Sequence, residues 1–512
     1  KKFWAFIQNK RGGSRIPNIM NFNGQDLSNP NEIVNAFSSF FNSVYIPSDP
    51  NISLPQCTQD IPNLLVSICH ISEDEILQAL KNCKNSLTAG VDHIPSFLLK
   101  DCAYIFVKPL YILFNLIIKT SVFPELWKRA AVTPIFKTGD PSLVENYRPI
   151  CLLCNFAKVL ESIIYKQIYS NIRCFITPSQ HGFMENKSTV TNLACFNQYV
   201  SEAIDRKNQV DVIYTDFRKA FDQIDHYLLI KKLQAFGFSL SLLLLLESYL
   251  LNRELFVKYH NFCSTSFFPT SGVPQGSNLG PLLFLLFVND VCNVVSCESL
   301  LFADDLKLFS EVNCTGDCER LQKDLLSVTN WSEVNRLSLN TLKCYTMTYS
   351  RKLTNITFNY NIRSENLTRA NTHRDLGVLF DSKLYFIDHI NDCVTKAYRS
   401  FGFIYRNCKA FNNIQALLTL YFSLVRSRLE YAAIIWYPIY QVHISHIEKI
   451  QRKFLKFLAY LCDGIYPPQG SDHAVLLKRF NCNSLSTRRS IQTVKFLYNI
   501  LNNKIDCSYI LN

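Results

Sequence analysis

Two adjacent carboxylates inside an apolar stretch constrain this sequence more than any other feature. Asp304 and Asp305 lie at the centre of residues 300–309, which read LLFADDLKLF. The apolar residues on both sides predict two short strands that meet at a tight turn carrying the acidic pair. Asp is common in turns, so a solvated turn is the simpler alternative. The apolar flanks disfavour that alternative, and two like charges in a buried hairpin need a counter-charge.

A third carboxylate follows another β-rich run. Residues 210–216 read VDVIYTD, so Asp216 stands where this predicted strand ends. A buried carboxylate is costly unless it is hydrogen-bonded or binds a metal. Oxygen ligands favour Mg²⁺ or Mn²⁺ over zinc. Two such ions about 4 Å apart can activate a hydroxyl and stabilise the leaving oxygen of a phosphoryl transfer, so the three carboxylates are candidate metal ligands.

The remaining periodicity indicates a mixed α+β protein with an antiparallel sheet. Ser72 and Glu75 form a capping-box pattern ahead of a helical run. The apolar runs 242–246 and 281–288 are shorter than the roughly 18 residues that a membrane-spanning helix needs, so we expect buried core helices and no membrane partner. The other expected elements are a strand at 131–136 and helices at about 104–120, 219–236, 317–335 and 388–403.

Basic charge is concentrated in the last third of the chain. The 512 residues include 53 Lys and Arg against 41 Asp and Glu, a formal net charge of +12. Residues 396–456 contain ten basic and two acidic residues and so carry +8 of it. A basic surface suits a polyanion such as nucleic acid, although a solvated helical face is the simpler interpretation. We expect the aromatic residues among these charges to form a core.

Composition indicates a globular protein with reduced thiols, which favours an intracellular location. The hydrophobic share of 48% excludes wholesale disorder and collagen-like structure. The 19 cysteines are scattered, and no secretory signal leads the chain. Cys151 and Cys154 form a CxxC, but no second pair lies nearby at zinc spacing, so we expect core packing. Because the first residue is not Met, we expect a fragment of a longer protein.

Several segments together resemble one family, the reverse transcriptases. LFADDLKLF resembles their central catalytic hairpin, and YTDFRKAFD at 214–222 resembles their first catalytic motif. SGVPQGSNLGPLLF at 271–284 resembles the motif between them, and the 88 residues from Asp216 to Asp304 suit the family. Further matching segments are PIFKTGD, NYRPI and QHGF upstream, and SLNTLKC and DLGVLFD downstream.

The C-terminal segments narrow the resemblance to reverse transcriptases of non-LTR retrotransposons of the jockey-like group. RSRLEYAAIIWYP at 426–438 and IEKIQRKF at 447–454 resemble their tails. The resemblance spans roughly residues 71–460, and seven or eight motifs in order are far more specific than any one of them. It implies a right-hand polymerase with fingers, an antiparallel ferredoxin-like palm and a helical thumb.

The resemblance also implies a division of the chain. The reverse transcriptase domain is expected at about 120–380. The expected parts are an N-terminal lead-in or linker at 1–70, fingers at 71–205, a palm with the catalytic motifs at 206–350, a primer-grip region with a basic helical thumb at 351–470, and a C-terminal tail at 471–512.

By resemblance, the catalytic centre would hold two Mg²⁺ or Mn²⁺ ions. Asp216 and Asp304 would be metal ligands, Asp305 a more peripheral member of the set, and the backbone carbonyl of Phe217 a further ligand. Lys343 stands where the family's candidate proton donor to pyrophosphate lies, and an exposed lysine after a helix is the alternative.

A bulky aromatic in the first catalytic motif would select the sugar. By resemblance, the ring of Phe221 would occupy the space that a ribose 2′-hydroxyl needs, and so exclude ribonucleotides. A core Phe is the alternative. Asp222 and Asp225 follow it, and we expect both to be caps or solvated residues.

The same resemblance supplies further nucleotide contacts. Gln275 would contact the incoming nucleotide and the template, and Gly276 would permit close approach of the backbone. A Gly/Pro turn before a helix is the alternative for this loop. Lys137 and Arg148 would grip the triphosphate electrostatically, although by themselves they are ordinary surface cations.

The basic C-terminal region would be the thumb that holds a primer–template duplex. Neutralised phosphates supply most of the affinity for nucleic acid and carry no sequence information. The candidate nucleic-acid-binding residues are Arg426, Arg428, Arg452, Lys453 and Lys456.

The leading interpretation is an RNA-directed DNA polymerase in which a primer 3′-hydroxyl attacks the α-phosphate of a dNTP. Its expected partners are an RNA template, a DNA primer and dNTPs. Family members often carry an apurinic-type endonuclease upstream, which nothing in residues 1–70 resembles, so we expect it to be missing from this fragment. A nuclear location is expected from the habit of the family.

Other functions are open to the same motifs. A decayed or domesticated element that binds RNA or DNA without catalysis is the second interpretation, and the retained carboxylates argue against it. A viral RNA polymerase or a nucleotide cyclase would share the two-metal palm, but Phe221 and the jockey-like tail disfavour both. A group II intron maturase is closer, and the tail disfavours it as well.

Overall fold

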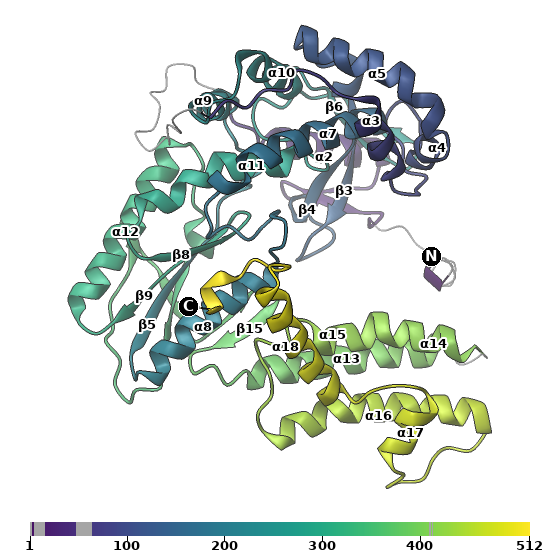
Figure 1. The fold of residues 1–512 in the computed structure, drawn as a ribbon, viewed down its shortest axis with the longest axis vertical. Helices are drawn as coiled ribbons and strands as arrows, with labels where there is room; N and C mark the ends of the chain where they lie inside the picture. Colours follow the sequence, from purple (N-terminus) through teal and green to yellow (C-terminus); the bar gives the residue numbers. More distant parts are fainter. Residues whose placement is uncertain (1–2, 5–15, 48–63, 409–410, 412, 512) are drawn as a thin grey trace.

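The computed structural model describes residues 3–4, 16–47, 64–408, 411 and 413–511. Helices and strands follow one another in mixed order along this chain. Figure 1 shows strands through the middle of the molecule, a helical group above them and a second helical group below. This arrangement confirms the predicted α+β class.

A five-stranded central sheet carries the predicted acidic turn. Its strands are β5 (Gln209–Thr215), β8 (Glu298–Phe302), β9 (Asp305–Val312), β10 (Tyr345–Tyr349) and β13 (Thr368–Ala370). The strand order is β13-β10-β5-β9-β8, and all seven residues of β5 are buried. Most pairs are antiparallel, as predicted, but the edge strand β13 pairs with β10 in parallel.

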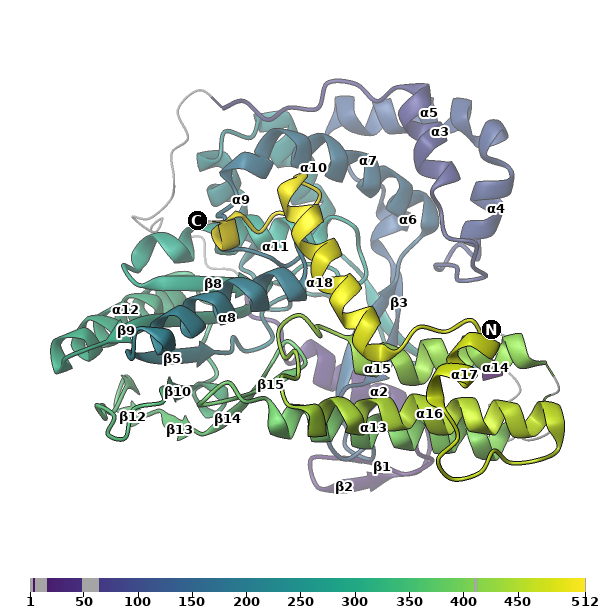
Figure 2. The ribbon, with the colours of Figure 1, turned by 60° about the horizontal axis from the view of Figure 1, so that its bottom comes forward.

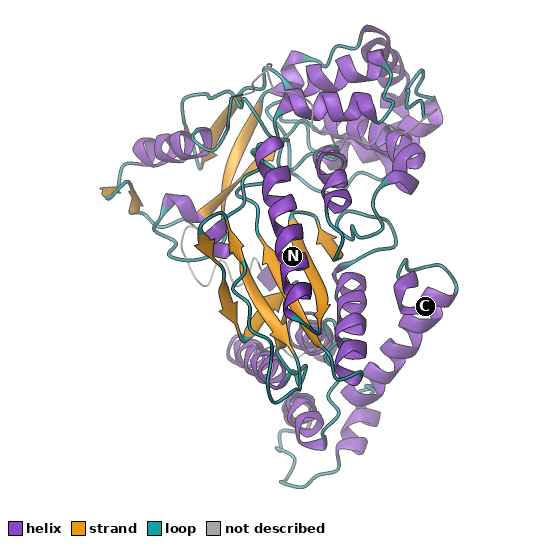
Figure 3. Cartoon of the chain, turned by 90° about the vertical axis from the view of Figure 1, so that its left-hand side faces the viewer, coloured by secondary structure: helices purple, strands orange, loops and turns teal. Residues whose placement is uncertain are grey.

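Helices cover both faces of the central sheet, as Figure 3 shows. Val212 and Tyr214 of β5 pack in the apolar cluster that includes residues of α8 (Thr189–Asp205). The intervening Ile213 packs in the cluster that includes residues of α12 (Thr315–Val334). Successive strand residues point to opposite faces, so a strand covered on both faces carries apolar residues at consecutive positions, as residues 212–214 do.

The structure contains a second sheet, which has four strands. Its order is β4-β3-β6-β7, with β3 antiparallel to β4 and parallel to β6. Phe37 and Phe41 of an N-terminal helix are buried in the core of this sheet. The predicted domain boundaries stay predictions. The bounds are β1 (Met20–Phe22), β2 (Gln25–Leu27), α2 (Pro30–Asn42), β3 (Ala130–Phe136), β4 (Tyr147–Leu152), β6 (Leu255–Tyr259) and β7 (Phe262–Cys263).

A helical group shares one apolar cluster with residues of the central sheet. The predicted capping box is confirmed, since the Ser72 hydroxyl accepts from the Glu75 amide and the Glu75 carboxylate accepts from the Ser72 amide. The helices are α3 (Glu73–Lys81), α4 (Ser96–Asp101), α5 (Ala103–Thr120), α6 (Glu125–Lys128), α7 (Asn155–Ile172), α9 (His226–Ala235), α10 (Leu240–Leu250) and α11 (Gly280–Val288).

The two apolar runs form the short, buried helices α10 and α11, as predicted. Within the described residues, α5 is the one helix long and apolar enough to cross a membrane by length and composition alone. One side of α5 packs into the protein core through Leu110, Phe114 and Ile117. Core helices of globular proteins share this composition.

The two thiols of the CxxC lie in different apolar clusters. Cys151 packs in the core of the second sheet, and Cys154 packs among the helices of the larger cluster. Burial raises the pKa of each thiol to about 11, so both are neutral near pH 7. The expected core packing is confirmed for this pair.

The C-terminal region is helical and has its own aromatic core. The Tyr421 ring stacks on Phe454 with ring centroids 4.2 Å apart, and Trp436 is almost fully buried, as expected for core aromatics. In Figure 2 the last long helix crosses from this region back toward the central sheet. The bounds are β11 (Asn361–Ile362), β12 (Glu365–Asn366), β14 (Thr372–Asp375), β15 (Val378–Asp381), α13 (Ile387–Asn407), α14 (Ile414–Tyr421), α15 (Ser427–Glu430), α16 (Gln441–Asp463), α17 (His473–Arg479) and α18 (Leu485–Leu501).

The helix expected at 219–236 begins later than its apolar spacing predicted. Lys219 has a left-handed backbone with φ of 43°, and the chain makes turns until Asp225. The Asp225 carboxylate caps α9 by accepting from the Leu228 amide at 3.1 Å. A cap is what was expected of Asp225, and its position sets the start of the helix. The helices expected at 104–120, 317–335 and 388–403 are present.

Candidate active site

The acidic pair lies at the turn between β8 and β9, as predicted. Ala303 has a left-handed backbone with φ of 57°, Asp304 follows it in the turn, and Asp305 is the first residue of β9. Thr215 of β5 is paired with Leu306 of β9. Because β5 and β9 are antiparallel, this register brings Asp216, just past the end of β5, beside the acidic turn.

The three carboxylates interact electrostatically. Burial raises the pKa of Asp304, and the Asp216 carboxylate raises it further, whereas Arg148 and Lys137 lower it. Desolvation, followed by the carboxylates of Asp304, Asp375 and Asp216, raises the pKa of Asp305 to about 7. Neighbouring carboxylates therefore make ionisation of Asp304 and Asp305 less favourable, and a bound cation would relieve this repulsion.

Phe217, whose carbonyl is the further ligand that the resemblance implies, lies in a short bridge next to Asp216. Phe217 forms a single β-bridge with Leu339, in which the Asn340 amide donates to the Asp216 carbonyl at 2.7 Å and the Arg218 amide donates to the Ser338 carbonyl at 2.8 Å. Neither hydrogen bond of this bridge uses the Phe217 carbonyl. Its role as a metal ligand, which the resemblance implies, stays a prediction.

This donor set fits a divalent cation that also binds substrate. Within the described part of the chain, no three His, Cys, Asp or Glu side chains are grouped to hold one ion by themselves. Mg²⁺ usually binds one or two carboxylates and completes its shell with water and substrate phosphates. Asp216, Asp304 and the Phe217 carbonyl fit that pattern, while Asp305 is the more exposed of the adjacent pair.

Two polar side chains contact the Asp216 carboxylate from the segment after α12. The Asn340 amide donates to its Oδ2 at 3.2 Å, and the Lys343 Nζ lies 3.6 Å from the same oxygen. Lys343 is more than half exposed, so it is free to reach a ligand. The structure thus brings the predicted lysine to the acidic site. It also adds Asn340, for which the motif SLNTLKC was the sequence signal.

The two predicted triphosphate cations face the same site from the second sheet. Arg148 lies on β4, and Lys137 follows the end of β3, which pairs with β4. Desolvation and then the charges of Arg148 and Lys343 lower the pKa of Lys137, while Asp216 and Asp304 raise it. The three cations and two carboxylates are therefore close enough to interact.

The predicted sugar-selecting ring lies beside the loop that precedes α11. The Phe221 ring stacks on Phe284 of α11, with centroids 4.3 Å apart and an interplanar angle of 17°. The Phe221 carbonyl accepts from the Val273 amide at 2.8 Å, which ties the first motif to the loop. Gly276 has φ of +112°, and a Cβ there would lie 2.9 Å from the Cys151 carbonyl oxygen. The loop needs glycine at this position.

Asp222 corrects one prediction from the sequence. Its side chain is neither a helix cap nor solvated, because the residue is only 6% exposed and its Oδ1 accepts from the Gln275 amide at 2.7 Å. Burial raises the pKa of Asp222 to about 6, whereas the bond from Gln275 and the charges of Lys219 and Arg148 lower it. Spacing along the first motif could not reveal a partner that lies 53 residues later.

Gln180 and His181 form hydrogen bonds to the backbone of the acidic hairpin, and we call this pair of residues the clamp. The Gln180 side-chain oxygen accepts from the amides of Gly182 and Ala303 at 2.7 and 2.9 Å, and its amide donates to the Ala303 carbonyl at 3.3 Å. The His181 amide donates to the Leu301 carbonyl at 2.9 Å. The QHGF motif thus holds the residue that precedes Asp304. The sequence singled out this motif but gave no indication of this contact.

A cavity of about 440 Å³ opens beside the carboxylates. Asp216, Asp305 and Lys343 line one part of it, and Tyr345 and His373 line another. Buried Lys307, two residues after Asp305, forms an ion pair with Asp375 at its edge. The DLGVLFD motif predicted as part of the primer-grip region begins at Asp375, so this region borders the acidic site.

The predicted nucleic-acid-binding residues differ in solvent exposure and in whether their charged groups already have a partner within the protein. Arg428, Arg452 and Lys453 are exposed. Arg426 lies over the Phe422 ring and forms an ion pair with Glu430 at 3.8 Å, and the Lys456 ammonium donates to the Pro468 carbonyl at 2.7 Å. The structure brings all five to the C-terminal helices, and the first three present their charge at the surface.

The clamp on the acidic turn gives a test that needs no substrate. In Gly182→Ala, the new Cβ would lie 2.3 Å from the Ala303 amide nitrogen, so the turn has to move. Changes in groups that orient metal ligands typically cost about 10–100-fold in metal affinity, so we expect Mn²⁺ affinity, measured by electron paramagnetic resonance titration, to fall about tenfold or more.

Gly316→Ala is the matched control, because its Cβ meets only the Cys314 sulfur at 3.6 Å. It should leave Mn²⁺ affinity unchanged. A folded Gly182→Ala variant with wild-type Mn²⁺ affinity would contradict the role of the clamp.

Comparison with known proteins agrees with this geometry. Residues 135–376 match the family model described as reverse transcriptase (RNA-dependent DNA polymerase). The chain is 30% identical over 345 residues to a probable RNA-directed DNA polymerase from transposon BS of Drosophila melanogaster, covering 64% of this chain and 38% of that protein. A probable RNA-directed DNA polymerase from transposon X-element of the same species is 30% identical over 352 residues, covering 66% and 37%.

The RNA-directed DNA polymerase from mobile element jockey of Drosophila funebris is 26% identical over 364 residues, covering 68% of this chain and 39% of that protein. The chain thus spans less than two fifths of the length of these relatives. The matched region contains the acidic turn, Asp216, the loop before α11 and Lys343. The chain therefore carries a reverse transcriptase domain at residues 135–376 and is similar to the RNA-directed DNA polymerases of non-LTR, LINE-type elements.

Proposed function

We propose that this chain extends a DNA primer on an RNA template, as the polymerase part of a non-LTR retrotransposon. The observation that carries the proposal is the acidic turn, where Asp216 and Asp304 face Lys137, Arg148 and Lys343. Carboxylates that bind a cation, surrounded by cations that bind phosphate, are what transfer of a nucleotidyl group requires.

Each residue then has a defined task. Asp216, Asp304 and the Phe217 carbonyl hold the divalent ions, for which we propose a pair. When bound, such ions lower the pKa of the attacking hydroxyl and neutralise charge on the leaving oxygen. Lys137 and Arg148 bind the triphosphate, and Lys343 gives a proton to the pyrophosphate that leaves.

The elements around the site match the parts of a right-hand polymerase. We assign the central sheet to the palm, the second sheet with its helices to the fingers, and the C-terminal helices with Arg428, Arg452 and Lys453 to the thumb. The template–primer duplex would then lie between the acidic turn and the thumb. We further propose, from the habit of the family, that the chain acts in the nucleus alongside an endonuclease encoded upstream.

Removing one of the proposed metal-binding carboxylates distinguishes a polymerase from a protein that only binds nucleic acid. Asp304→Asn should abolish dNTP incorporation on an RNA template with Mg²⁺, because it removes a negative charge from the ion site while keeping the shape of the side chain. Primer extension on a gel measures the effect, and thermal unfolding should show a folded protein.

Asp205→Asn is the control, since Asp205 is exposed at the end of α8 and belongs to none of the motifs. Full activity in Asp304→Asn would exclude the metal assignment. A wild-type chain that binds template–primer but extends no primer would favour the decayed or domesticated element.

A smaller side chain at the predicted sugar gate should relax discrimination against ribonucleotides. Phe221→Val removes the ring that would meet a 2′-hydroxyl, so we expect the ratio of kcat/KM for dNTP over rNTP to fall about tenfold or more. Single-nucleotide incorporation assays measure this ratio. Phe268→Val, at an exposed position, should leave it unchanged. An unaltered ratio in Phe221→Val would remove the gate role.

The exposed thumb cations should bind phosphate without reading sequence. Arg452→Gln and Lys453→Gln together should weaken template–primer binding equally for different sequences and reduce the slope of log K against log salt by about 1 for each phosphate that is no longer neutralised. Fluorescence anisotropy over a series of salt concentrations measures the slope. Arg426→Gln should change the slope less, because its charge is already paired with Glu430. Weaker binding of one template sequence alone would contradict the assignment.

A further inference from the structure

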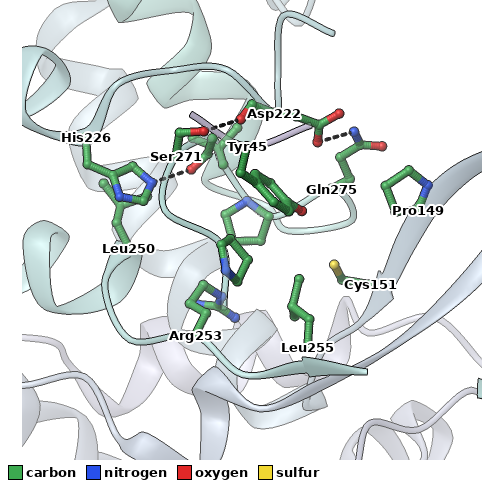
Figure 4. Close-up of a pocket in the computed structure, with 14 residues that line it drawn as sticks. Tyr45, Pro149, Cys151, Asp222, His226, Leu250, Arg253, Leu255, Ser271 and Gln275 are labelled. Carbon is green, nitrogen blue, oxygen red and sulfur yellow. Dashed lines mark hydrogen bonds between the residues drawn. The ribbon is translucent and has the colours of Figure 1, made fainter. Parts of the chain in front are cut away.

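The buried carboxylate of Asp222 contacts the loop before α11, which would contact the nucleotide. Asp222 is only 6% exposed and takes no part in the proposed metal or triphosphate site. Figure 4 shows it at the top of a small cavity lined also by Tyr45, Cys151 and Arg253. A buried carboxylate is unfavourable unless its hydrogen bonds offset the desolvation, so the partners of Asp222 indicate why it is there.

Four hydrogen bonds join residues 221–224 to residues 271–275 of the loop before α11. The Ser271 hydroxyl donates to the Asp222 carbonyl at 2.7 Å, and the Gly272 amide donates to the Ile224 carbonyl at 2.7 Å. The Val273 amide donates to the Phe221 carbonyl at 2.8 Å. The fourth is the bond between the side chains of Gln275 and Asp222 (Figure 4).

The backbones of these two segments, around residues 222 and 272, approach each other closely. A Cβ on Gly272 would lie 2.6 Å from the Asp222 carbonyl oxygen, so the loop can approach only because position 272 is glycine with φ of +81°. The Cys151 amide of β4 donates to the Gln275 carbonyl at 2.9 Å. The backbone of Gln275 is thus fixed from one side by β4, and its side chain is fixed from the other by Asp222.

The chemistry of a carboxylate determines which end of the Gln275 amide faces it. An ionised carboxylate only accepts hydrogen bonds, whereas an amide side chain has a donor end and an acceptor end. The Gln275 Nε2 therefore has to face Asp222, and the Oε1 points away, toward the side of Pro149 in Figure 4. Lys219 and Arg148 are the cations near enough to favour the ionised form of Asp222.

We infer that Asp222 is a positioning residue, whose carboxylate holds the side-chain amide of Gln275 in one orientation for contact with the incoming nucleotide. This inference rests on the proposed function, in which Gln275 contacts the nucleotide and the template. Asp222 itself touches no reacting atom. Its effect should appear in nucleotide binding more than in the chemical step.

Asn at position 222 tests the inference while keeping the volume of the side chain. The Asn amide can accept from the Gln275 Nε2 or donate to its Oε1, so Asp222→Asn removes the selection between the two orientations. The loss of one such hydrogen bond corresponds to about three- to tenfold in affinity. We expect KM for dNTP in primer extension to rise by about that factor, with kcat within about twofold of wild type.

A double-mutant cycle separates positioning from general structural damage. Gln275→Ala should raise KM for dNTP by a similar factor, and Asp222→Asn added to Gln275→Ala should have no further effect on KM. Asp324→Asn is the matched control, because Asp324 is similarly buried and accepts from the Ser296 and Cys297 amides far from the loop. It should leave KM unchanged. Additive effects on KM, or wild-type KM in Asp222→Asn, would overturn the inference.

The same four proteins are compared by thermal unfolding, which does not depend on activity. Asp222→Asn and Gln275→Ala should shift the unfolding temperature non-additively, since they share one hydrogen bond. A wild-type chain that extends no primer would reject the proposed function, and the unfolding cycle would still decide whether Asp222 and Gln275 are coupled. Additive shifts would show that the two side chains act independently and would overturn the inference.

Discussion

The repulsion among carboxylates at the end of the central sheet is the constraint on which the rest of the structure depends. Asp304 and Asp305 share a tight turn, and the register of β5 on β9 adds Asp216 to them. Burial and mutual repulsion raise the pKa values of the adjacent pair. Such an arrangement costs stability unless cations balance it, and the surrounding segments supply Lys137, Arg148 and Lys343 from different parts of the chain.

Buried polar side chains direct their hydrogen bonds to the backbone of turns near the site. Gln180 holds the turn that carries Asp304, and the Asn192 amide donates to the Leu301 carbonyl at 3.0 Å. The Glu161 carboxylate accepts from the Asn278 amide at 2.6 Å, just ahead of α11. Each bond replaces water at a backbone group that would otherwise be buried without a partner. Residues outside the proposed ligand contacts therefore hold the backbone around the site.

Local patterns predicted much of the fold, because they depend on neighbours in sequence. The capping box of α3, the apolar run of β5 and the acidic hairpin each follow from a short stretch of residues, and all are present. The start of α9 did not follow from apolar spacing, because a left-handed Lys219 and the Asp225 cap delay it. The parallel edge strand β13 also has no local signal, since register across a sheet is set by long-range pairing.

The site itself was predicted as a set of residues but not as a network. Resemblance to a family named Asp216, Asp304, Gln275 and Lys343, but did not supply their partners. Gln180 and Ala303 are 123 residues apart, and Asp222 and Gln275 are 53 apart. Periodicity along one segment carries no information about such pairs, and that is why Asp222 was expected to be a cap or solvated.

The C-terminal segment shows how the basic helices are tied to the same network. After α18 the chain returns to the start of α8, where the Asp506 amide donates to the Asn186 carbonyl at 2.9 Å (Figure 2). The Lys187 side chain, which is buried, pairs with Asp506 and donates to the Pro178 carbonyl at 2.6 Å, two residues before Gln180. One short segment thus contacts both the C-terminal region and the clamp on the acidic turn. The segment that follows the basic helices is therefore bound next to the segment that carries the clamp.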